Sequence, residues 1–282
     1  MFGGLFGKSG PQLKKMAPKH LAQVIQIIEE TDEDDAAEAE ETLVERNLQG
    51  MYVLLNEGRV LGVTGAVATE DVDDVNWLSW TYLSEDSRGQ GLGRFMVNEL
   101  LGTLNARKIR KIFIATSDYR EDGEDIYADA RRLYEGFGAV EELRITKFHS
   151  NDEAKIIYGL VNPGVEAMPA GAFERVTGVE FHDLYPAPES SGGFGINWTV
   201  AEEGVSGLDV LVEEAGRESA RMVVTSLPQD VSEYAENDLI QHGFEKQGEL
   251  KDYYGVGISQ IWWAHTGNDI KLIAHSPGSA GV

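Results

Sequence analysis

Short runs of apolar residues alternate with segments in which apolar residues recur every three or four positions, and this alternation continues from residue 13 to residue 161. The short runs predict strands, and the spaced residues predict helices with one buried face. A helix is expected to begin at Pro18, because Leu21, Val24 and Ile28 then share one face. The predicted strands are 13–15, 51–55, 59–68, 77–83, 112–116, 140–148 and 155–161, and the predicted helices are 18–28, 36–46, 91–106 and 126–136.

The order of these elements is strand, two helices, three strands, helix, strand, helix and two strands. Helices and strands that alternate in this way predict an α/β fold with a mixed sheet. The acidic run 29–45 has few large apolar residues and is expected to form a solvated helix. The polar, acidic segment 117–125 is expected to form a loop.

A glycine-rich turn, Arg88-Gly-Gln-Gly-Leu-Gly93, connects the strand 77–83 to the helix 91–106. The first backbone N–H groups of a helix have no partner inside the helix, and they lie at the positive end of its dipole. Glycines let a phosphate approach the backbone without a Cβ in the way. The turn therefore predicts a pyrophosphate site, although many glycine-rich turns before helices bind nothing.

The spacing of the glycines separates this turn from two common phosphate-binding motifs. It lacks the GK[ST] ending of an ATP-binding P-loop, and it lacks the first spaced glycine of the GxGxxG dinucleotide motif. Arg88, Gly91 and Gly93 instead fit the pattern Arg/Gln-x-x-Gly-x-Gly/Ala. In this respect the turn resembles the coenzyme A pyrophosphate loop of the GNAT superfamily of N-acetyltransferases, and the element order of residues 13–161 resembles the GNAT order.

A second motif adds to this resemblance. The family often carries Ala-x-x-x-Tyr-x-x-x-Gly-Phe in the helix that corresponds to 126–136. Ala130, Tyr134 and Gly138 occupy three of those positions, whereas Ala139 replaces the phenylalanine. The family often has a coenzyme-binding asparagine three residues before the alanine, and Tyr127 stands there in this sequence.

The resemblance implies acetyl-CoA as a co-substrate and no metal. The backbone of the strand before the turn would hold the thioester and the pantetheine, and the backbone of the turn would hold the pyrophosphate. Tyr134 would protonate the leaving thiolate, for which a phenol with a pKa of ~10 is a suitable acid. The alternative is a tyrosine that only packs under the sheet. The implied coenzyme-binding residues are Thr81, Tyr82, Leu83, Arg88, Gly89, Gln90, Gly91, Leu92, Gly93 and Arg94.

The general base that would deprotonate the amine is not determined by the sequence. Asp118, Glu121 and Asp122 lie in the loop where the amine would arrive, but for each one alone a solvated loop residue is the preferred interpretation. The six histidines show no metal-binding spacing, and no GxSxG elbow is present.

The second half of the chain is similar to the first. A linker begins at Asn162 and runs through Gly171, and Ala130, Gly138, Ile156 and Gly159 then match residues at a constant offset of 105. We expect a GNAT domain at 13–161 and a degenerate GNAT-like repeat at 165–282, with chance similarity of two α/β segments as the alternative. The matched residues are Ala235, Gly243, Ile261 and Ala264.

The repeat departs from the motif where chemistry would occur. Its turn carries Glu202 and Glu203, which would repel a pyrophosphate, and Leu239 stands at the position of Tyr134. One coenzyme site per chain is therefore expected. The aromatic pairs 253–254 and 262–263 are expected to belong to the sheet core, or alternatively to line an acceptor pocket.

The 282 residues carry 48 acidic and 24 basic side chains, a net charge of −24 that extends over both halves. Such a field disfavours nucleic acid and anionic membranes and attracts cationic amines, although a solubility or salt-adapted surface is the preferred explanation of the charge. The chain has no cysteine and no apolar run of ~18 residues, and its glycine-rich start is too short for a signal peptide. A cytoplasmic location is expected.

Together these features predict an acetyl-CoA-dependent N-acetyltransferase that acts on a primary amine of a small molecule or a peptide. Nucleic acid and membrane are not expected as partners, and a homodimer is compatible with the sequence. The first alternative is a non-catalytic acyl-CoA-binding module with a regulatory or interaction role. The second is an enzyme that uses a longer acyl donor or an aminoacyl donor.

Overall fold

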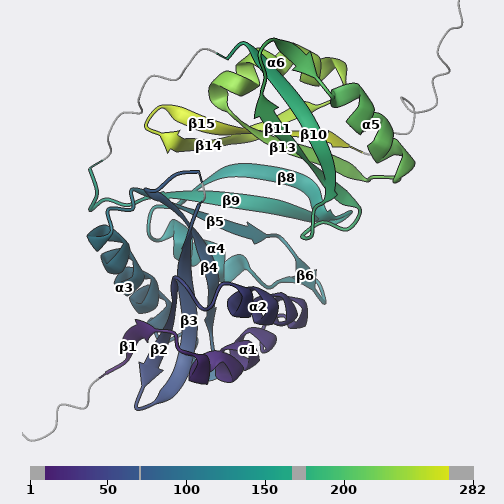
Figure 1. Ribbon diagram of the computed structural model, residues 1–282. Helices are drawn as coiled ribbons and strands as arrows, with labels where there is room; N and C mark the ends of the chain where they lie inside the picture. Colours follow the sequence, from purple (N-terminus) through teal and green to yellow (C-terminus); the bar gives the residue numbers. More distant parts are fainter. Residues whose placement is uncertain (1–9, 70, 167–175, 267–282) are drawn as a thin grey trace, which may run out of the picture. The chain divides into compact units, whose positions relative to one another are not determined.

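The computed structural model of the protein describes residues 10–69, 71–166 and 176–266. The chain folds into two compact units (Figure 1). The first unit contains the residues up to Ala115 together with Ala128–Ala139 and Leu160–Glu166, and the second contains the rest. The glycine-rich start of the chain and the end of the predicted linker, 167–171, lie outside the described residues.

The first unit is built on a sheet with the strand order β1-β2-β3-β4-β5. Neighbouring strands are antiparallel except β4 and β5, which are parallel, so the expectation of a mixed sheet is confirmed. The strands are β1 (Gln12–Lys15), β2 (Met51–Asn56), β3 (Arg59–Ala68), β4 (Val75–Leu83) and β5 (Lys111–Ser117). The helices are η1 (Pro18–His20), α1 (Leu21–Glu29), α2 (Glu33–Glu45), η2 (Glu85–Ser87), α3 (Leu92–Ala106) and α4 (Ala128–Glu135).

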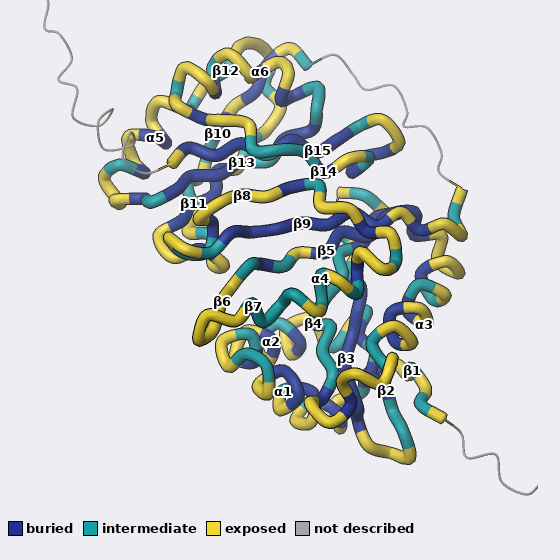
Figure 2. The backbone as a smooth tube through the Cα atoms, turned by 180° about the vertical axis from the view of Figure 1, so that it is seen from behind, coloured by how far each residue is buried: buried dark blue, intermediate teal, exposed yellow. Residues whose placement is uncertain are grey.

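Helices cover both faces of this sheet. The helices α1 and α2 lie side by side and pack on the face that carries Val53 and Val63 (Figure 1). Leu54 points the other way and packs with Leu61 and Met96, the last of which belongs to α3. The central strand β3 is consequently buried along most of its length (Figure 2). The alternation of side chains along β2 thus assigns each helix to its face.

The acidic helix differs from the expectation in two ways. It begins at Glu33 and not at Ala36, because the Asp32 side chain caps it by accepting the N–H groups of Asp34 (2.9 Å) and Asp35 (3.1 Å). It is also not solvated on all sides, since Ala36, Ala39 and Leu43 are buried against α1 and the sheet. Small apolar residues at helical spacing were sufficient for packing, and the density of charge concealed that pattern.

The second unit contains a six-stranded sheet with the order β12-β10-β11-β13-β15-β14. The unit also contains a β8–β9 hairpin and the short pair β6–β7, which lies within the segment 117–125 that was expected to be a loop. The strands are β6 (Arg120–Glu121), β7 (Glu124–Asp125), β8 (Val140–Ser150), β9 (Glu153–Val161), β10 (Gly178–Pro186), β11 (Gly193–Val200), β12 (Gly204–Ser206), β13 (Met222–Pro228), β14 (Glu245–Gly255) and β15 (Ile258–Thr266). The helices are α5 (Leu208–Arg217) and α6 (Gln229–Gln241).

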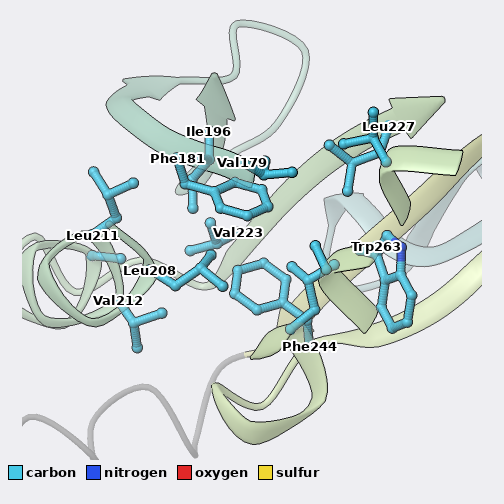
Figure 3. Packing of buried hydrophobic residues seen from close by; sticks show 14 of the residues in the cluster. Val179, Phe181, Ile196, Leu208, Leu211, Val212, Val223, Leu227, Phe244 and Trp263 are labelled. Carbon is cyan, nitrogen blue, oxygen red and sulfur yellow. The ribbon is translucent and has the colours of Figure 1, made fainter. Parts of the chain in front are cut away.

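The pairing pattern of the second sheet repeats that of the first. β10 and β11 are antiparallel, β11 and β13 are parallel, and α5 lies between the two parallel strands in sequence. β3, β4, α3 and β5 have the same relationship in the first unit. The core of the second sheet includes Phe181, Phe244 and Trp263, which pack with Leu208 of α5 (Figure 3). Trp263 and Tyr253 are buried, whereas Trp262 and Tyr254 are half-buried, so one member of each aromatic pair belongs to the core.

Arg221, just before β13, connects the second sheet to the β8–β9 hairpin of the same unit. Its guanidinium donates hydrogen bonds to the carbonyls of Lys147 and Phe148 (2.7 Å) and to the Ser190 hydroxyl (3.0 Å), and its Nε donates to the Ser191 carbonyl (2.8 Å). A single planar side chain thus satisfies several backbone acceptors in fixed directions. None of the helices that the structure describes is long and apolar enough to cross a membrane.

We expect Arg221→Lys to lower the free energy of unfolding of the second unit by about 2 kcal/mol, because an ammonium group lacks the fork that reaches these carbonyls. Guanidinium-induced unfolding of the full chain, followed by tryptophan fluorescence, measures the change. Arg217→Lys is the matched control, since Arg217 forms only an exposed ion pair with Glu213 (2.8 Å). Equal midpoints for the two variants would contradict the role given to Arg221.

Candidate active site

The strand β4 separates from β5 shortly after the two strands meet. Only Val75, Asn76 and Trp77 of β4 pair with β5, and their partners are Lys111–Phe113. From Leu78 onward β4 has no ladder on that side within the described residues, although it stays paired with β3 to Leu83. An unpaired strand edge exposes N–H and C=O groups that an extended ligand can use as a further strand does. The strand that the sequence resemblance assigns to the thioester and the pantetheine therefore leaves its parallel neighbour at Leu78.

A β-bulge lies in the separated part of β4. Val63 pairs with Tyr82 and Gly65 pairs with Ser79, so β4 has one residue more than β3 between these pairs. The extra residue brings Trp80 to a φ of +35°, in the left-handed region that non-glycine residues rarely adopt. The Trp80 indole donates to the Thr42 hydroxyl (3.2 Å), and the Tyr82 hydroxyl donates to the Asp35 carboxylate, so α2 holds both side chains of the bulge.

The bulge was not predicted from the sequence, but a signal for it was present. Gly62 lies opposite Leu83, and a Cβ on it would be 2.6 Å from a Leu83 methyl group. A Cβ on Gly65 would be 2.2 Å from the Met51 sulfur. Glycine inside a strand often marks a bulge or a close approach of two backbones, and both glycines flank the irregular register here.

The turn between β4 and α3 presents unpaired backbone N–H groups. Gly89 and Gly91 adopt left-handed φ angles of +71° and +76°, and Gly91 is the N-cap of α3 without any side-chain cap. The helical ladder starts with the N–H of Phe95, which donates to Gly91 (3.1 Å). None of the N–H groups from Gly89 to Arg94 has an acceptor among the described residues. A Cβ on Gly89 or Gly91 would meet no atom within 4 Å, so the space above the turn is open. This is the geometry of an anion site at a helix N-terminus.

The polar side chains of the turn point back into the protein. Arg88 donates through Nε to the Leu83 carbonyl (3.2 Å) and through Nη2 to the Thr31 hydroxyl (2.7 Å). Gln90 donates to the Asp86 carbonyl (2.7 Å), and Arg94 donates to the Gly136 carbonyl (3.0 Å) while lying over the Phe137 ring. The side chains therefore fix the turn, and its backbone is what remains for a ligand. For Gln90 and Arg94 this agrees with the sequence expectation, but the structural use of Arg88 was not foreseen.

Tyr134 lies in α4 and is buried. Burial raises the pKa of Tyr134 to about 12, and the Thr81 side chain of the bulged strand opposes part of that rise. The phenol is therefore protonated throughout the physiological range. Tyr134, Thr81 and the glycine-rich turn all belong to the first unit, so one unit contains the expected acid and the expected coenzyme loop.

The candidate bases in the segment 117–125 belong to the second unit. Asp118 accepts the N–H of Ala154 (2.8 Å) and forms an ion pair with Arg144 (3.0 Å). Both carboxylate oxygens of Asp118 are thus engaged by other groups of the same unit, which gives Asp118 a structural role. Glu121 and Asp122 are exposed in the β6–β7 hairpin, where Asp122 occupies the left-handed turn position. No group of three His, Asp or Glu residues in the described ranges has the arrangement of a metal site.

In the second unit, the turn between β11 and α5 has a different arrangement. Gly204–Ser206 form β12, which pairs in parallel with β10. The Gly204 N–H donates to the Thr177 carbonyl (3.1 Å), and Gly207 approaches Phe181 so closely that a Cβ would lie 1.9 Å from its carbonyl oxygen. The N–H groups at this turn are partly consumed by the sheet, and exposed Glu202 and Glu203 add negative charge.

Comparison with protein families connects this geometry to a known fold. Residues 19–139 match the model of the Acetyltransferase (GNAT) family. This segment is a GNAT acetyltransferase domain. It contains every residue of the candidate site, from Thr81 to Tyr134, and its mixed α/β sheet is the GNAT fold. A search of curated proteins found no match.

Solved structures similar to this chain include three acetyltransferases. A GNAT-family acetyltransferase from Desulfovibrio desulfuricans is 23% identical, with a TM-score of 0.49 over 54% of this chain and 99% of its own. The ribosomal-protein-S18-alanine N-acetyltransferase from Escherichia coli is 18% identical, with a TM-score of 0.46 over 58% and 99%. An N-acetyltransferase from Staphylococcus aureus is 16% identical, with a TM-score of 0.43 over 55% and 99%.

Because the Arg88 side chain holds the glycine-rich turn through Thr31, we predict that Arg88→Ala and Thr31→Val each loosen the start of this turn. The protected amides there are those of Ser84, Ser87 and Arg88, which donate to Leu61, Ser84 and Glu85. Loss of one such hydrogen bond, at about 1 kcal/mol, should speed their hydrogen exchange about fivefold. Arg107→Ala, at the far end of α3, is the control and should leave these rates unchanged. Unchanged hydrogen-exchange rates of these amides in the Thr31→Val protein would show that Arg88 does not act through Thr31.

Proposed function

We propose that the protein is an acetyl-CoA-dependent N-acetyltransferase that acetylates a primary amine of a small molecule or a peptide. One observation carries the proposal: the GNAT domain has an open row of backbone N–H groups at the start of α3, directly after a strand that has left its parallel neighbour. The pyrophosphate and the pantetheine of coenzyme A require these two features side by side. The buried Tyr134 beside that strand is the third feature and is the expected proton donor.

In this proposal the coenzyme is held mainly by backbone groups. The N–H groups of Gly89 to Arg94 receive the pyrophosphate, whose negative charge the helix dipole also stabilises. The edge of β4 at Thr81, Tyr82 and Leu83, beyond the end of the ladder with β5, receives the amide-containing pantetheine arm as an added strand. The inward hydrogen bonds of Arg88, Gln90 and Arg94 preorganise the loop, so little order has to be gained on binding.

The chemistry follows from these positions. The amine nitrogen attacks the thioester carbonyl and forms the C–N bond of the amide, the C–S bond breaks, and the amine gives up a proton. The sulfur leaves as a thiolate, which Tyr134 stabilises by donating its O–H. A phenol with a pKa of about 12 is available in this form at any physiological pH.

The acceptor must reach this site as a neutral amine at the moment of attack. The net charge of −24 favours a cationic amine over an anionic acceptor during encounter. Acetyl-CoA as donor and a sequence without cysteine fit a cytoplasmic enzyme. We further propose that the GNAT domain extends over 13–161 and that 165–282 is a degenerate repeat, because the two sheets share their strand pairing and helix order.

A second candidate function is an acyl-CoA-binding module without catalysis. It is favoured by the hydrogen bonds that engage Asp118, which leave the chain without an evident base in the segment 117–125. Tyr127 at the family's asparagine position points the same way. The two candidates share the coenzyme site and differ only in turnover.

Measurements of acetyl-CoA binding and of amine acetylation therefore distinguish the enzyme from the binding module. Calorimetry should give one acetyl-CoA per chain, and release of free thiol should follow on addition of amines from a panel of polyamines, amino sugars and peptide N-termini. Gly91→Val should weaken coenzyme binding by about tenfold or more, because a β-branched residue disfavours the φ of +76° and covers the turn. Gly102→Val, in the middle of α3, is the control. Binding without turnover across the panel would establish the module, and no binding would end both proposals.

Tyr134→Phe tests the acid. The substitution removes only the hydroxyl, so we expect kcat to fall by about 10²–10³ while KM for acetyl-CoA changes little. In the wild-type protein, ionisation of Tyr134 should not lower kcat until the pH approaches its pKa of about 12, because the active form is the protonated one. A Tyr134→Phe protein with the wild-type kcat across the pH range would exclude the role.

A further inference from the structure

A cavity of about 80 Å³ is lined by α6 and by the strands β14 and β15 of the second unit. Gln229, Ser232, Glu233 and Glu236 line it from α6, where residues at i, i+3, i+4 and i+7 share one face. The other lining residues are Lys246 and Glu249 of β14 and Ile261 and Trp263 of β15. The candidate active site uses none of them.

A β-bulge in β14 brings two charged residues to the same wall of this cavity. Lys246 pairs with Trp263 and Glu249 pairs with Ile261, so β14 has one residue more than β15 between these pairs. Residues three apart in a regular strand point to opposite faces of the sheet, but the extra residue brings Lys246 and Glu249 to one face. That face is the one that α6 covers, because Ile261 and Trp263 pack in the core with the apolar side chains of α6.

The walls of the cavity carry an excess of negative charge. Three carboxylates, those of Glu233, Glu236 and Glu249, stand against the single ammonium group of Lys246. Glu233 accepts a hydrogen bond from Gln229 (3.0 Å). No ion pair or hydrogen bond in the described part of the chain engages the side chains of Glu236 and Glu249. A ligand with positive charge is therefore favoured over a neutral or anionic one.

The size and shape of the cavity favour an organic cation over a metal ion. No group of three His, Asp or Glu residues in the described ranges has the arrangement of a metal site, so these carboxylates do not converge on one point. A cavity of about 150 Å³ encloses benzene, so the volume of about 80 Å³ suits a ligand of about three or four non-hydrogen atoms. Ile261 and Trp263 provide buried apolar surface for a short carbon chain.

The buried part of the cavity also offers one hydrogen-bond donor. Ser232 is only 4% exposed, and its hydroxyl oxygen accepts the indole N–H of Trp263 (2.9 Å). The Ser232 proton itself has no acceptor among the residues that the structure describes. Since a buried O–H without an acceptor is destabilising, a ligand oxygen at this position would bind favourably.

We propose that this cavity binds a small amino alcohol. Its ammonium group lies against the carboxylates of Glu236 and Glu249, and its hydroxyl oxygen accepts the O–H of Ser232. The carbon atoms between these two groups contact Ile261 and Trp263. The site belongs entirely to the second unit and does not rest on the proposed acetyl transfer.

Titration of the full-length protein with ethanolamine, ethylamine and ethylene glycol, followed in ¹H–¹⁵N NMR spectra, tests the proposal. The Trp263 indole N–H reports on the site through its bond to Ser232, and Trp263→Phe identifies its signal among those of the five tryptophans. Ethanolamine should shift this signal with a dissociation constant in the millimolar range, as its size allows. Ethylamine, which lacks the acceptor, should bind about fivefold more weakly, and ethylene glycol, which lacks the charge, should not bind.

Three variants separate the contributions of charge and hydrogen bonding. Glu249→Gln should weaken the binding of both amines about tenfold, because an ion-paired hydrogen bond is lost. Glu245→Gln is the matched control, since Glu245 is an exposed residue of the same strand that does not line the cavity. Ser232→Ala should remove the preference for ethanolamine over ethylamine, and retained ethylamine binding would show that the cavity is still formed.

Two results would overturn the proposal. One is an unshifted Trp263 signal at the highest ethanolamine concentration, or an equal shift with ethylene glycol, since either shows that the cavity does not select an ammonium group. The other is equal weakening of ethanolamine binding by Glu249→Gln and Glu245→Gln, which would assign the attraction to the acidic surface as a whole.

Discussion

The candidate site depends on one constraint, the early end of the pairing between β4 and β5. A parallel ladder that continued along β4 would consume the backbone groups of Leu78 to Leu83 and would close the sheet. Here it stops after Trp77, and the bulge at Trp80 turns the strand away while α2 anchors the Trp80 and Tyr82 side chains. The free run of β4 beyond Trp77 and the entry of the chain into the glycine-rich turn both follow from this separation.

In the second unit, two parallel strands, β11 and β13, also separate early, but side chains bridge them. β11 pairs with β13 only over Gly193–Gly195, as β4 does with β5 over three residues. Beyond that point the Trp198 indole donates to the Ser226 carbonyl (2.9 Å), and Thr225 donates to the Ile196 carbonyl. Side chains of the unit thus bridge the diverging strands. Together with β12, which takes up the turn, this explains why we assign one coenzyme site to the chain.

Much of this architecture could be predicted from the sequence. Apolar spacing located the strands and helices to within a few residues, and the element order with Arg88, Gly91 and Gly93 indicated the GNAT domain. Local patterns sufficed there because helices, strands and turns are encoded by neighbouring residues. The short β6–β7 hairpin was missed, since its polar residues have no apolar alternation to reveal it.

The remaining features depend on partners that are distant in sequence. Arg88 was expected to belong to the coenzyme loop, but its side chain is held by Thr31, 57 residues earlier. The bulge is fixed by contacts of Trp80 and Tyr82 with α2, and the hydrogen bond between the Thr64 and Thr81 hydroxyls crosses the irregular register. Asp118 could not be separated from Glu121 and Asp122 as a base until Arg144 was found beside it. The spacing of apolar residues along the sequence carries no information about such contacts.

Hydrogen exchange of the full chain with and without acetyl-CoA tests the central claim, that the backbone of one turn in the GNAT domain holds the coenzyme. The account predicts that acetyl-CoA slows exchange at the amides of Gly89 to Arg94 and along the β4 edge at Thr81 to Leu83, and leaves the amides of Gly204 to Asp209 unaffected. Protection at the second turn, or saturation at two molecules per chain, would contradict a single coenzyme site. Unchanged exchange from Gly89 to Arg94 at saturating acetyl-CoA would contradict the claim itself.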